Sequence, residues 1–297
     1  MIPRRLWIAV NPHSGGGRGP SILRSLMPIF EAADVALTIH ETRHAGHAAD
    51  LVRQLDTSEL DAFCVVGGDG TMHEAVNGLL SRPDKPALPL AMIPAGSGNA
   101  FLHGFECLDP VDAARRIVAG NARAIDAAHV SLGDQTIYAF NIVGWGLVAD
   151  VLATSEKLRW LGETRYTLAS ALEVLKGRRR RARLIFDGRD STDRFSFILG
   201  CNTPYTGKGM RMAPRADVSD GLIDLIIVRA APRLKILRLL PKVFDGSHVN
   251  SPLLEYVQTA EFSIIPEKDE RNNIDGELTA AGPLHVKMMP RAFQMLI

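Results

Sequence analysis

The sequence has few cysteines, and their positions exclude two common uses of that residue. Three occur among 297 residues, Cys64, Cys107 and Cys201. They show neither the spacing of a zinc site nor the arrangement of a disulfide framework. Cys64 lies in an apolar run and is expected to be a buried thiol. A reducing, cytoplasmic location is therefore expected.

The sequence also lacks an excess of charge of either sign. It has 34 basic and 33 acidic residues, a net charge of +1. No global field favours a nucleic-acid partner, so any basic patch must be local. The most apolar segment, residues 137–149, is too short for a membrane span, and the N-terminus enters a strand without a signal-peptide pattern. We expect a soluble protein that is at most peripheral to a membrane.

The chain does have the length and the apolar content for two cores. Its 297 residues, 46% of them hydrophobic, favour two domains. Apolar runs that predict strands occur at residues 6–10, 35–41, 62–66 and 88–93. Helical spacing follows each run, ending with a helix expected over residues 110–119. This alternation predicts an α/β domain with a parallel sheet over residues 1–123.

Beyond residue 123 the pattern changes to closely spaced strands. They are predicted at residues 124–132, 136–143, 182–187, 195–201, 222–228, 261–265 and 284–289. Gly133-Asp134 is typical of a hairpin turn between the first two, and a helical segment is expected over residues 152–175. Residues 124–297 are therefore predicted to form a β-rich, sandwich-like domain.

The most informative stretch is Gly67-Gly68-Asp69-Gly70-Thr71, which follows a predicted strand and precedes helical spacing. The first N–H groups of such a helix can hold an anion. The glycines would let backbone approach a phosphate and accept positive φ, and Thr71 is the predicted N-cap. Asp69 would repel an anion unless it binds a metal or a proton. An ordinary tight turn is the alternative.

Two further glycine turns strengthen the case for a binding site. Residues 15–17 follow the first predicted strand, and residues 95–99 follow the fourth. All three turns lie at carboxyl ends of strands, where open α/β sheets bind ligands. A flexible loop explains any one of them, but three converging turns favour a phosphate site.

These motifs resemble the diacylglycerol kinase and sphingosine kinase superfamily. The resemblance rests on residues 67–71, extended over 68–79, and on Pro-Ala-Gly-Ser-Gly-Asn-Ala at 94–100. Further matching stretches are Asn11-Pro12 and residues 144–150, 155–165, 209–224 and 275–277. The longer motifs are most similar to the sphingosine and ceramide kinase branch. The resemblance implies an ATP- and Mg²⁺-dependent lipid kinase with its active site in the cleft between the two domains.

The same resemblance implies roles for individual residues. Nucleotide-binding positions would be Asn11, Pro12, His13, Thr42, Gly67, Gly68, Asp69, Gly70, Thr71, Gly96, Ser97, Gly98, Arg159, Arg165 and Asp275. If one helix carries Glu156, Arg159, Gly162 and Arg165, their spacing gives them a common face. Asp69 and Glu277 are alternative catalytic bases, and the sequence does not decide between them.

A structural Mg²⁺ is implied at Asp217, Asp220 and Leu222, by the carboxylate of Asp220 and backbone oxygens of the other two. An acidic surface turn is an equally good interpretation of that stretch.

The lipid is expected to contact Glu74, Asp150 and Leu152. Leu152 stands where sphingosine kinases have an aspartate that meets the polar head. A neutral head group, as in ceramide or diacylglycerol, therefore fits better than sphingosine.

Six basic residues crowd residues 176–183, at a short loop predicted before the strand at 182–187. Such a run is usually solvated, but in a lipid kinase it could dock on anionic head groups of a bilayer. The expected partner is thus a lipid at a membrane surface, with a homodimer as a candidate assembly. The competing functions are an NAD kinase-like enzyme and a lipid-binding protein that has lost catalysis.

Overall fold

The computed structural model describes residues 3–297, with only the backbone for Arg159 and Glu163. The chain forms two compact units. The first contains residues 1–126 and 291–297, and the second contains residues 127–290. The predicted division at residue 123 lies close to the end of the first segment. It does not include the return of the last seven residues.

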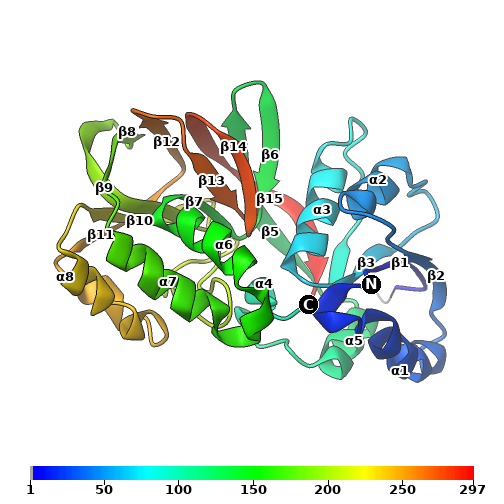
Figure 1. The fold of residues 1–297 in the computed structure, drawn as a ribbon. Helices are drawn as coiled ribbons and strands as arrows, with labels where there is room; N and C mark the ends of the chain where they lie inside the picture. The colour runs from blue at the N-terminus through cyan, green and yellow to red at the C-terminus, as the bar shows by residue number, and fades with distance from the viewer. Residues whose placement is uncertain (1–2) are drawn as a thin grey trace. The chain divides into compact units, whose positions relative to one another are not determined.

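The first unit is a parallel sheet covered by helices (Figure 1). Its strands are β1 (Arg5–Val10), β2 (Ala36–Glu41), β3 (Ala62–Gly67) and β4 (Leu90–Pro94), in the order β4-β3-β1-β2. Its helices are α1 (Gly19–Ala32), α2 (His47–Gln54), α3 (Asp69–Leu80), α4 (Ala100–His103) and α5 (Pro110–Ala119), with a 3₁₀ turn η1 (Ser14–Gly16). In Figure 1, α1 and α5 lie on one side of the sheet, and α2 and α3 lie on the other.

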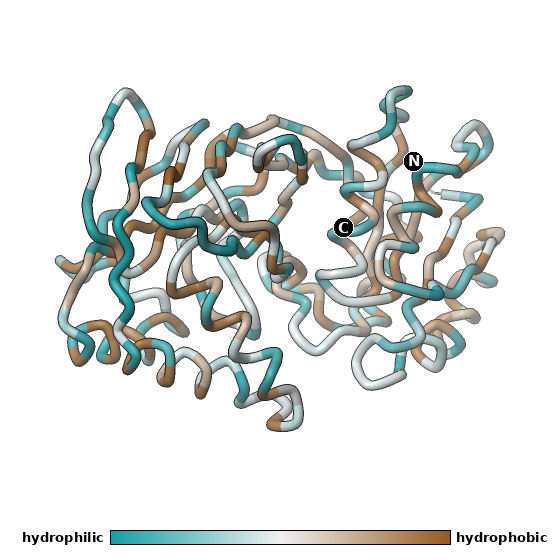
Figure 2. Tube along the Cα trace, turned by 45° about the horizontal axis from the view of Figure 1, so that its top comes forward, coloured by the Kyte–Doolittle hydropathy of each residue, from teal (hydrophilic) through white to brown (hydrophobic). Residues whose placement is uncertain are grey.

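The central strands of this sheet are buried on both faces, so they are almost continuously apolar rather than alternating. Leu23, Leu26 and Phe30 of α1 pack on one face. Along the helices in Figure 2, hydrophobic residues recur at intervals between hydrophilic ones, as burial of one side of a helix requires.

The second unit is built mainly of antiparallel strands. They are β5 (Ala122–Leu132), β6 (Gln135–Ala139), β7 (Ile142–Gly146), β8 (Arg180–Phe186), β9 (Arg189–Cys201), β10 (Ile223–Arg229), β11 (Leu254–Thr259), β12 (Glu261–Pro266), β13 (Arg271–Ile274), β14 (Glu277–Ala281) and β15 (Leu284–Leu296). Of these, β5 begins and β15 ends in the first unit. Its helices are α6 (Leu147–Lys157), α7 (Arg165–Lys176) and α8 (Arg233–Leu237), with 3₁₀ turns η2 (Arg159–Thr164), η3 (Pro241–Val243) and η4 (Ser247–Asn250). The predicted fold class, a parallel α/β domain followed by a β-rich domain, is confirmed.

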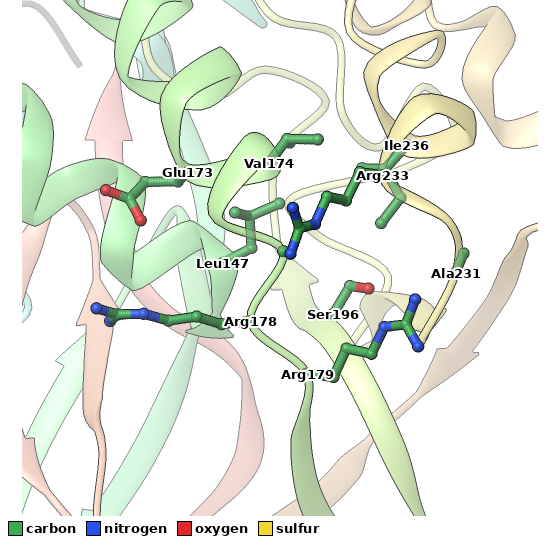
Figure 3. Close-up of a pocket in the computed structure, with 10 residues that line it drawn as sticks. Leu147, Glu173, Val174, Arg178, Arg179, Ser196, Ala231, Arg233 and Ile236 are labelled. Atoms are coloured by element: carbon green, nitrogen blue, oxygen red, sulfur yellow. The ribbon is translucent and has the colours of Figure 1, made fainter.

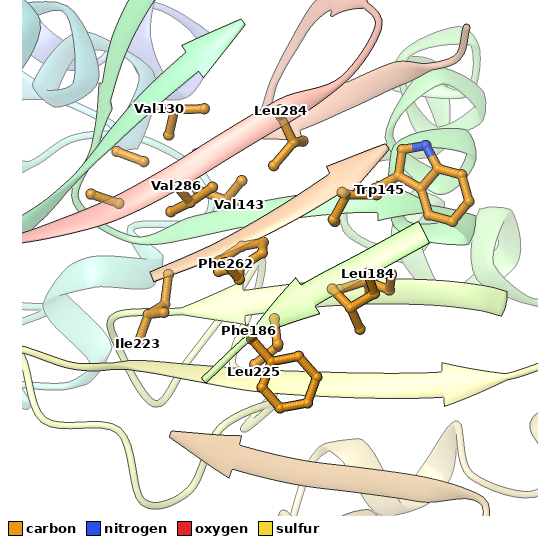
Figure 4. Close-up of a cluster of buried hydrophobic side chains, with 14 of the residues drawn as sticks. Val130, Val143, Trp145, Leu184, Phe186, Ile223, Leu225, Phe262, Leu284 and Val286 are labelled. Carbon is orange, nitrogen blue, oxygen red and sulfur yellow. The ribbon is translucent and has the colours of Figure 1, made fainter. Parts of the chain in front are cut away.

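The core of the second unit lies between its strands. Trp145, Phe262 and Leu184 are among its fully buried side chains (Figure 4). The predicted strand at 136–143 is wrong in one respect, because the chain breaks between β6 and β7. The N–H groups at this break are bonded to a distant carboxylate instead of continuing a ladder. The short strands β11, β13 and β14 were not predicted.

The fold also bears on membrane insertion. Within residues 3–297, as far as they are described, no helix is long and apolar enough to cross a membrane.

Candidate functional site

The three glycine turns of the first unit meet, as the sequence predicts. Gly15 has φ +56°, and a Cβ added there would lie 2.1 Å from the carbonyl oxygen of Ala95. A Cβ on Gly96 would lie 2.6 Å from the Cα of Gly68. Real Cβ atoms do not approach that closely, so only glycine lets the first and second turns pack against the third.

Asn11 joins the first turn to the second. Its Nδ2 donates to Oγ1 of Thr71 over 2.9 Å, and its Oδ1 accepts from the His13 N–H, also over 2.9 Å. The second contact is the local turn common for asparagine. The first ties residues 60 apart in sequence, so Asn11 both forms a turn and holds the site together.

The helix after the central glycines starts earlier than predicted. α3 begins at Asp69, and its N-cap is Gly68, with φ −112° and ψ −174°. Thr71 is therefore not the N-cap, because its hydroxyl is bonded to Asn11 inside the first turn. The prediction of positive φ at the central glycines is also wrong. Positive φ occurs instead at residues 15–17 of the first turn. The first N–H groups of a helix have no acceptor among its own carbonyls, and α3 begins directly after Gly68, where the second turn contacts the third.

Asp69 connects the second turn to the third. Its Oδ2 accepts from the N–H of Ala100 over 2.8 Å, and its Oδ1 accepts from the N–H of Phe101 over 3.2 Å. The carboxylate thus caps α4 and is oriented by two backbone donors. From the sequence, an acid in this loop was expected to bind a metal or a proton. The structure adds a third role, because the carboxylate holds the start of α4.

Asn99 is a further polar residue at the junction. It has φ +50°, and its Nδ2 donates to the carbonyl of Gly96. Its Oδ1 is buried without a hydrogen-bond partner from the described residues. An acceptor in this position suits a ligand hydroxyl, amino group or water. Asn99 belongs to the motif at residues 94–100, but the sequence did not single it out. Only the burial of its Oδ1 identifies it as a candidate ligand contact.

The other predicted nucleotide residues of the first unit surround this junction. Thr42 follows β2, is buried, and donates its N–H to the carbonyl of Val10. His13 and Ser97 are exposed, whereas Pro12 and Gly98 are half-buried. All five lie in or beside segments that follow the carboxyl ends of parallel strands.

Glu74 has a structural partner in the same unit. Its Oε1 accepts from the N–H of Gly46 over 2.7 Å, and its Oε2 accepts from the N–H of Ala48 over 3.1 Å. The carboxylate therefore caps the start of α2. Its expected contact with lipid stays a prediction.

In the second unit, Asp275 is buried in the turn between β13 and β14, at φ +51°. Its Oδ1 accepts from the N–H groups of Asn141 and Ile142 over 2.9 and 2.8 Å, and its Oδ2 accepts from that of Phe140 over 3.0 Å. Asp275 thus shapes the break before β7. Glu277 follows two residues later and is exposed at the start of β14.

The two predicted phosphate-binding arginines do not share a helix face. α6 ends at Lys157, the chain passes through η2, and α7 starts at Arg165. Within η2, Gly162 is non-helical, with φ +59° and ψ −125°. The side chain of Arg159 lies outside the described residues. The guanidinium of Arg165 lies 4.8 Å from the ring centre of Tyr166.

Asp150 belongs to a cluster of charged side chains. Its Oδ2 lies 2.6 Å from Nη2 of Arg180, which also pairs with Glu270, and its Oδ1 lies 3.6 Å from Arg178. Burial raises the pKa of Glu270, the charge of Arg180 opposes this, and that of Asp150 adds to it. Asp150 is thus already neutralised by protein cations.

Leu152, two residues further along α6, is 5% exposed. Its expected position beside the lipid head group stays a prediction.

The predicted metal residues form two successive turns before β10. Oδ1 of Asp217 accepts from Ser219, and Oδ1 of Asp220 accepts from the N–H of Leu222 over 2.9 Å. In the described part of the chain, no group of three or more histidine, cysteine or acidic residues is placed to hold a metal ion. The expected ion, with one carboxylate and two backbone oxygens, stays a prediction.

The candidate residues divide between the two units. Asp69 and the glycine turns belong to the first, whereas Arg165, Asp275 and Glu277 belong to the second. The expectation of an active site between them stays a prediction.

Comparisons with known proteins agree with this organisation. Residues 5–130 match the diacylglycerol kinase catalytic domain, and residues 141–297 match the YegS C-terminal NAD kinase beta sandwich-like domain. The chain is 32% identical to sphingosine kinase 1 of Arabidopsis thaliana, over 94% of this chain and 69% of that protein. It is 29% identical to the diacylglycerol kinase of Bacillus subtilis, over 92% of this chain and 90% of that protein.

The fold has a counterpart among solved structures. A diacylglycerol kinase from Bacillus anthracis strain Sterne superposes with a TM-score of 0.82 at 23% identity, covering 100% of this chain and 98% of that chain. Fold and sequence together define a family of lipid kinases. The chain belongs to the diacylglycerol kinase and sphingosine kinase superfamily.

Proposed function

We propose that the protein is an ATP-dependent lipid kinase that transfers the γ-phosphate of ATP to a lipid hydroxyl. The observation that carries the proposal is the meeting of the three glycine turns around the start of α3. Phosphoryl transfer depends mainly on positioning and charge neutralisation. A backbone junction at a helix N-terminus supplies both for a phosphate chain.

The nucleotide phosphates would lie against the opening N–H groups of α3 and the backbone of the three turns. Arg165, and by resemblance Arg159, would add positive charge. Mg²⁺ usually binds through phosphate oxygens with one or two carboxylates. When bound, the ion would neutralise charge that develops on the transferred group.

Glu277 is the better candidate for the catalytic base. Both oxygens of Asp69 already accept backbone N–H groups, and so do those of Asp275. Such carboxylates are suited to holding loops in place. The exposed Glu277 can present its carboxylate to a lipid hydroxyl and accept its proton as the oxygen attacks phosphorus.

The preferred lipid would have a neutral head group, such as diacylglycerol or ceramide. Position 152 is a leucine, and the nearby Asp150 is paired with Arg180. A cationic head group would therefore meet no available carboxylate from these two residues. Burying an unpaired ammonium costs several kcal/mol, which disfavours sphingosine.

The proposal is tested by incubating the purified chain with labelled ATP and Mg²⁺. Mixed micelles would carry diacylglycerol, ceramide or sphingosine, and a parallel reaction would contain NAD. We expect label in a neutral lipid and none in NADP. Preferential phosphorylation of sphingosine would contradict the head-group argument. Labelled NADP would support the NAD kinase alternative, and no product from any acceptor would favour a lipid-binding protein without catalysis.

A further inference from the structure

The second unit has a basic pocket that the proposed catalysis does not use. It lies where α7 ends, and is lined by residues of α6, α7, β9, α8 and their linkers (Figure 3). Its apolar wall includes Leu147, Val174 and Ile236, and its polar groups include Arg179, Arg233 and Ser196.

Two arginines of the pocket have no acidic partner. Arg179 and Arg233 make neither an ion pair nor a hydrogen bond with any described residue. Figure 3 shows their guanidinium groups on the same side of the linker, with Ser196 nearby, whereas Arg178 points to the opposite side. Alternation along an extended chain explains why successive arginines diverge. Two unpaired cations facing one pocket repel each other, so an anion bound between them would be stabilised.

The acid beside the pocket does not cancel this charge. Glu173 lines the pocket, but its Oε1 lies 2.5 Å from Nζ of Lys176 and accepts from the Thr154 hydroxyl. Burial acts to raise the pKa of Glu173, but these contacts outweigh it and lower the pKa. Glu173 is therefore a carboxylate already neutralised by its own lysine, and Arg179 and Arg233 keep their excess positive charge.

The geometry of Arg233 indicates a built pocket. A Cβ added to Gly177, which has φ +61°, would lie 2.1 Å from Nε of Arg233. The arginine thus lies directly over the backbone that ends α7, in space that a Cβ at residue 177 would occupy. The pocket is also remote from the nucleotide-binding candidate Arg165, because α7 separates the two by about 15 Å at 1.5 Å per residue.

Exposed leucines on the same helices indicate that the anion belongs to a membrane lipid and is not a soluble ion. Leu175 of α7 is 50% exposed and Leu234 of α8 is 66% exposed. Leu234 directly follows Arg233, and Leu175 lies two residues before Gly177. A site for a soluble anion gains nothing from exposed leucines. A phosphate held at a bilayer surface places acyl chains and interfacial carbon atoms beside them.

We propose that Arg179, Arg233 and Ser196 form a pocket for the phosphate head group of an anionic phospholipid, through which the second unit docks on a bilayer. The inference rests on the proposed function, because a lipid kinase must dock on a bilayer to reach its substrate. It differs from the expectation that the whole arginine run docks. β8 starts at Arg180, which is buried and paired, and Arg183 pairs with Asp190 over 2.6 Å.

The test is co-sedimentation of the full-length protein with vesicles, without nucleotide or lipid substrate. Vesicles would be phosphatidylcholine alone or with about 30% phosphatidylglycerol. The Arg179→Gln/Arg233→Gln variant should bind the anionic vesicles at least about 10-fold more weakly than the parent, since each basic residue near the surface contributes about 1 kcal/mol. Because kinase activity is not measured, an inactive enzyme would not alter this result.

The matched control removes the same charge elsewhere. Arg181 and Arg194 are exposed and directly opposite in the β8–β9 ladder. The Arg181→Gln/Arg194→Gln variant should stay within about 2-fold of the parent. Equal losses in both variants would show diffuse attraction and overturn the pocket, as would no loss in either. If Arg233→Gln disturbs packing at Gly177, Arg179→Gln alone should still weaken binding by about 3-fold.

A final arm separates the bilayer from free phosphate. Leu234→Gln should weaken vesicle binding, because it removes an apolar contact but no charge. Inorganic phosphate at constant ionic strength should leave vesicle binding nearly unchanged. Displacement by phosphate together with unaltered binding of Leu234→Gln would overturn the bilayer as the occupant.

Discussion

At the scale of single residues, the acids near the predicted site act largely as acceptors for the backbone. Asp69, Glu74 and Asp275 each take two or three N–H groups from segments distant in sequence. Each therefore fixes a turn or helix start whose position a ligand would depend on. A carboxylate in a kinase motif can thus be essential without touching the transferred proton.

This leads to a paired prediction for Asp69 and Glu277. Glu277→Gln should lower kcat about 100-fold or more and leave the melting temperature unchanged, because it removes the proposed base from an exposed position. Asp69→Asn should lower both kcat and melting temperature. In asparagine an NH2 group replaces one of the two carboxylate oxygens that accept from Ala100 and Phe101, and leaving a buried N–H without its acceptor costs about 1–3 kcal/mol.

Steady-state kinetics and thermal melting of the two variants would check this. A fully stable Asp69→Asn enzyme with lost turnover, beside a Glu277→Gln enzyme with parental turnover, would assign the base to Asp69 instead.

Asp224 gives a prediction about pH. It is 1% exposed, and burial raises its pKa above the ordinary value of 3.8, although hydrogen bonds from Tyr256 and Gln258 oppose the shift. Because the pKa of Asp224 is higher in the folded than in the unfolded state, protonated Asp224 stabilises the fold. This stabilisation is fully present below pH 3.8 and is lost as the pH rises through the raised pKa. At neutral pH the charged Asp224 therefore costs stability.

Asp224→Asn should accordingly melt higher than the parent at pH 7, by about 2 °C or more, with the difference shrinking toward pH 4. The amide oxygen can still accept from Tyr256. Calorimetric scans from pH 4 to 8 measure the difference, and Asp134→Asn on an exposed turn serves as control. A difference that is independent of pH would refute the role of this carboxyl.

At the scale of elements, the alternation of β8 decides what the arginine run can do. Arg180, Ala182 and Leu184 face inward and are buried, whereas Arg181 and Arg183 face outward. The run was predicted to lie in a short loop before a strand, whereas β8 already starts at Arg180. A period of two lets one arginine enter the interior, where Asp150 and Glu270 neutralise it.

Arg180→Met should therefore lower the free energy of unfolding by about 3 kcal/mol, because it leaves two partly buried carboxylates without their shared cation. Arg181→Met, one residue further on the exposed face, should change it by less than about 0.5 kcal/mol. Urea unfolding compares the two. Equal effects would mean that the ion-pair cluster does not contribute to stability.

At the scale of the whole molecule, the C-terminal residues of the chain pack into the N-terminal unit. Met295 and Leu296 of β15 pair in parallel with Leu90 and Ala91 of β4, and Ile297 donates its N–H to the carbonyl of Asn121. The first unit is thus made from two segments of the chain, and the whole sequence of the second unit lies between them.

Met295→Ala should destabilise the first unit by about 2–5 kcal/mol, because the side chain is fully buried. Amide exchange should become faster in β1, β3 and β4. Met289→Ala, at a half-buried position of the same strand, is the control and should have a smaller effect. Unchanged exchange in those three strands would contradict the role of the C-terminal segment.

Local patterns were sufficient for most helices and strands of the first unit and for its glycine turns. Continuous apolar runs identify β1, β3 and β4 because parallel strands are buried on both faces. The helix at Pro110–Ala119 was predicted to its observed bounds, with Asp109 capping it and Gly120 ending it. The glycine turns follow from the same rule, since the carboxyl ends of parallel strands share one edge.

The sequence by itself determined the fold class, the family and the convergence of the glycine turns, because these depend on periodicity and on short motifs. Only the tertiary structure decided which acids are held by backbone donors, that Arg180 is buried while Arg181 is not, and that residues 291–297 return to the first unit. Each of these depends on contacts between residues far apart in the chain. Such contacts leave no period or local signature, so the sequence shows the charge of Asp69 but not the two N–H groups that orient it.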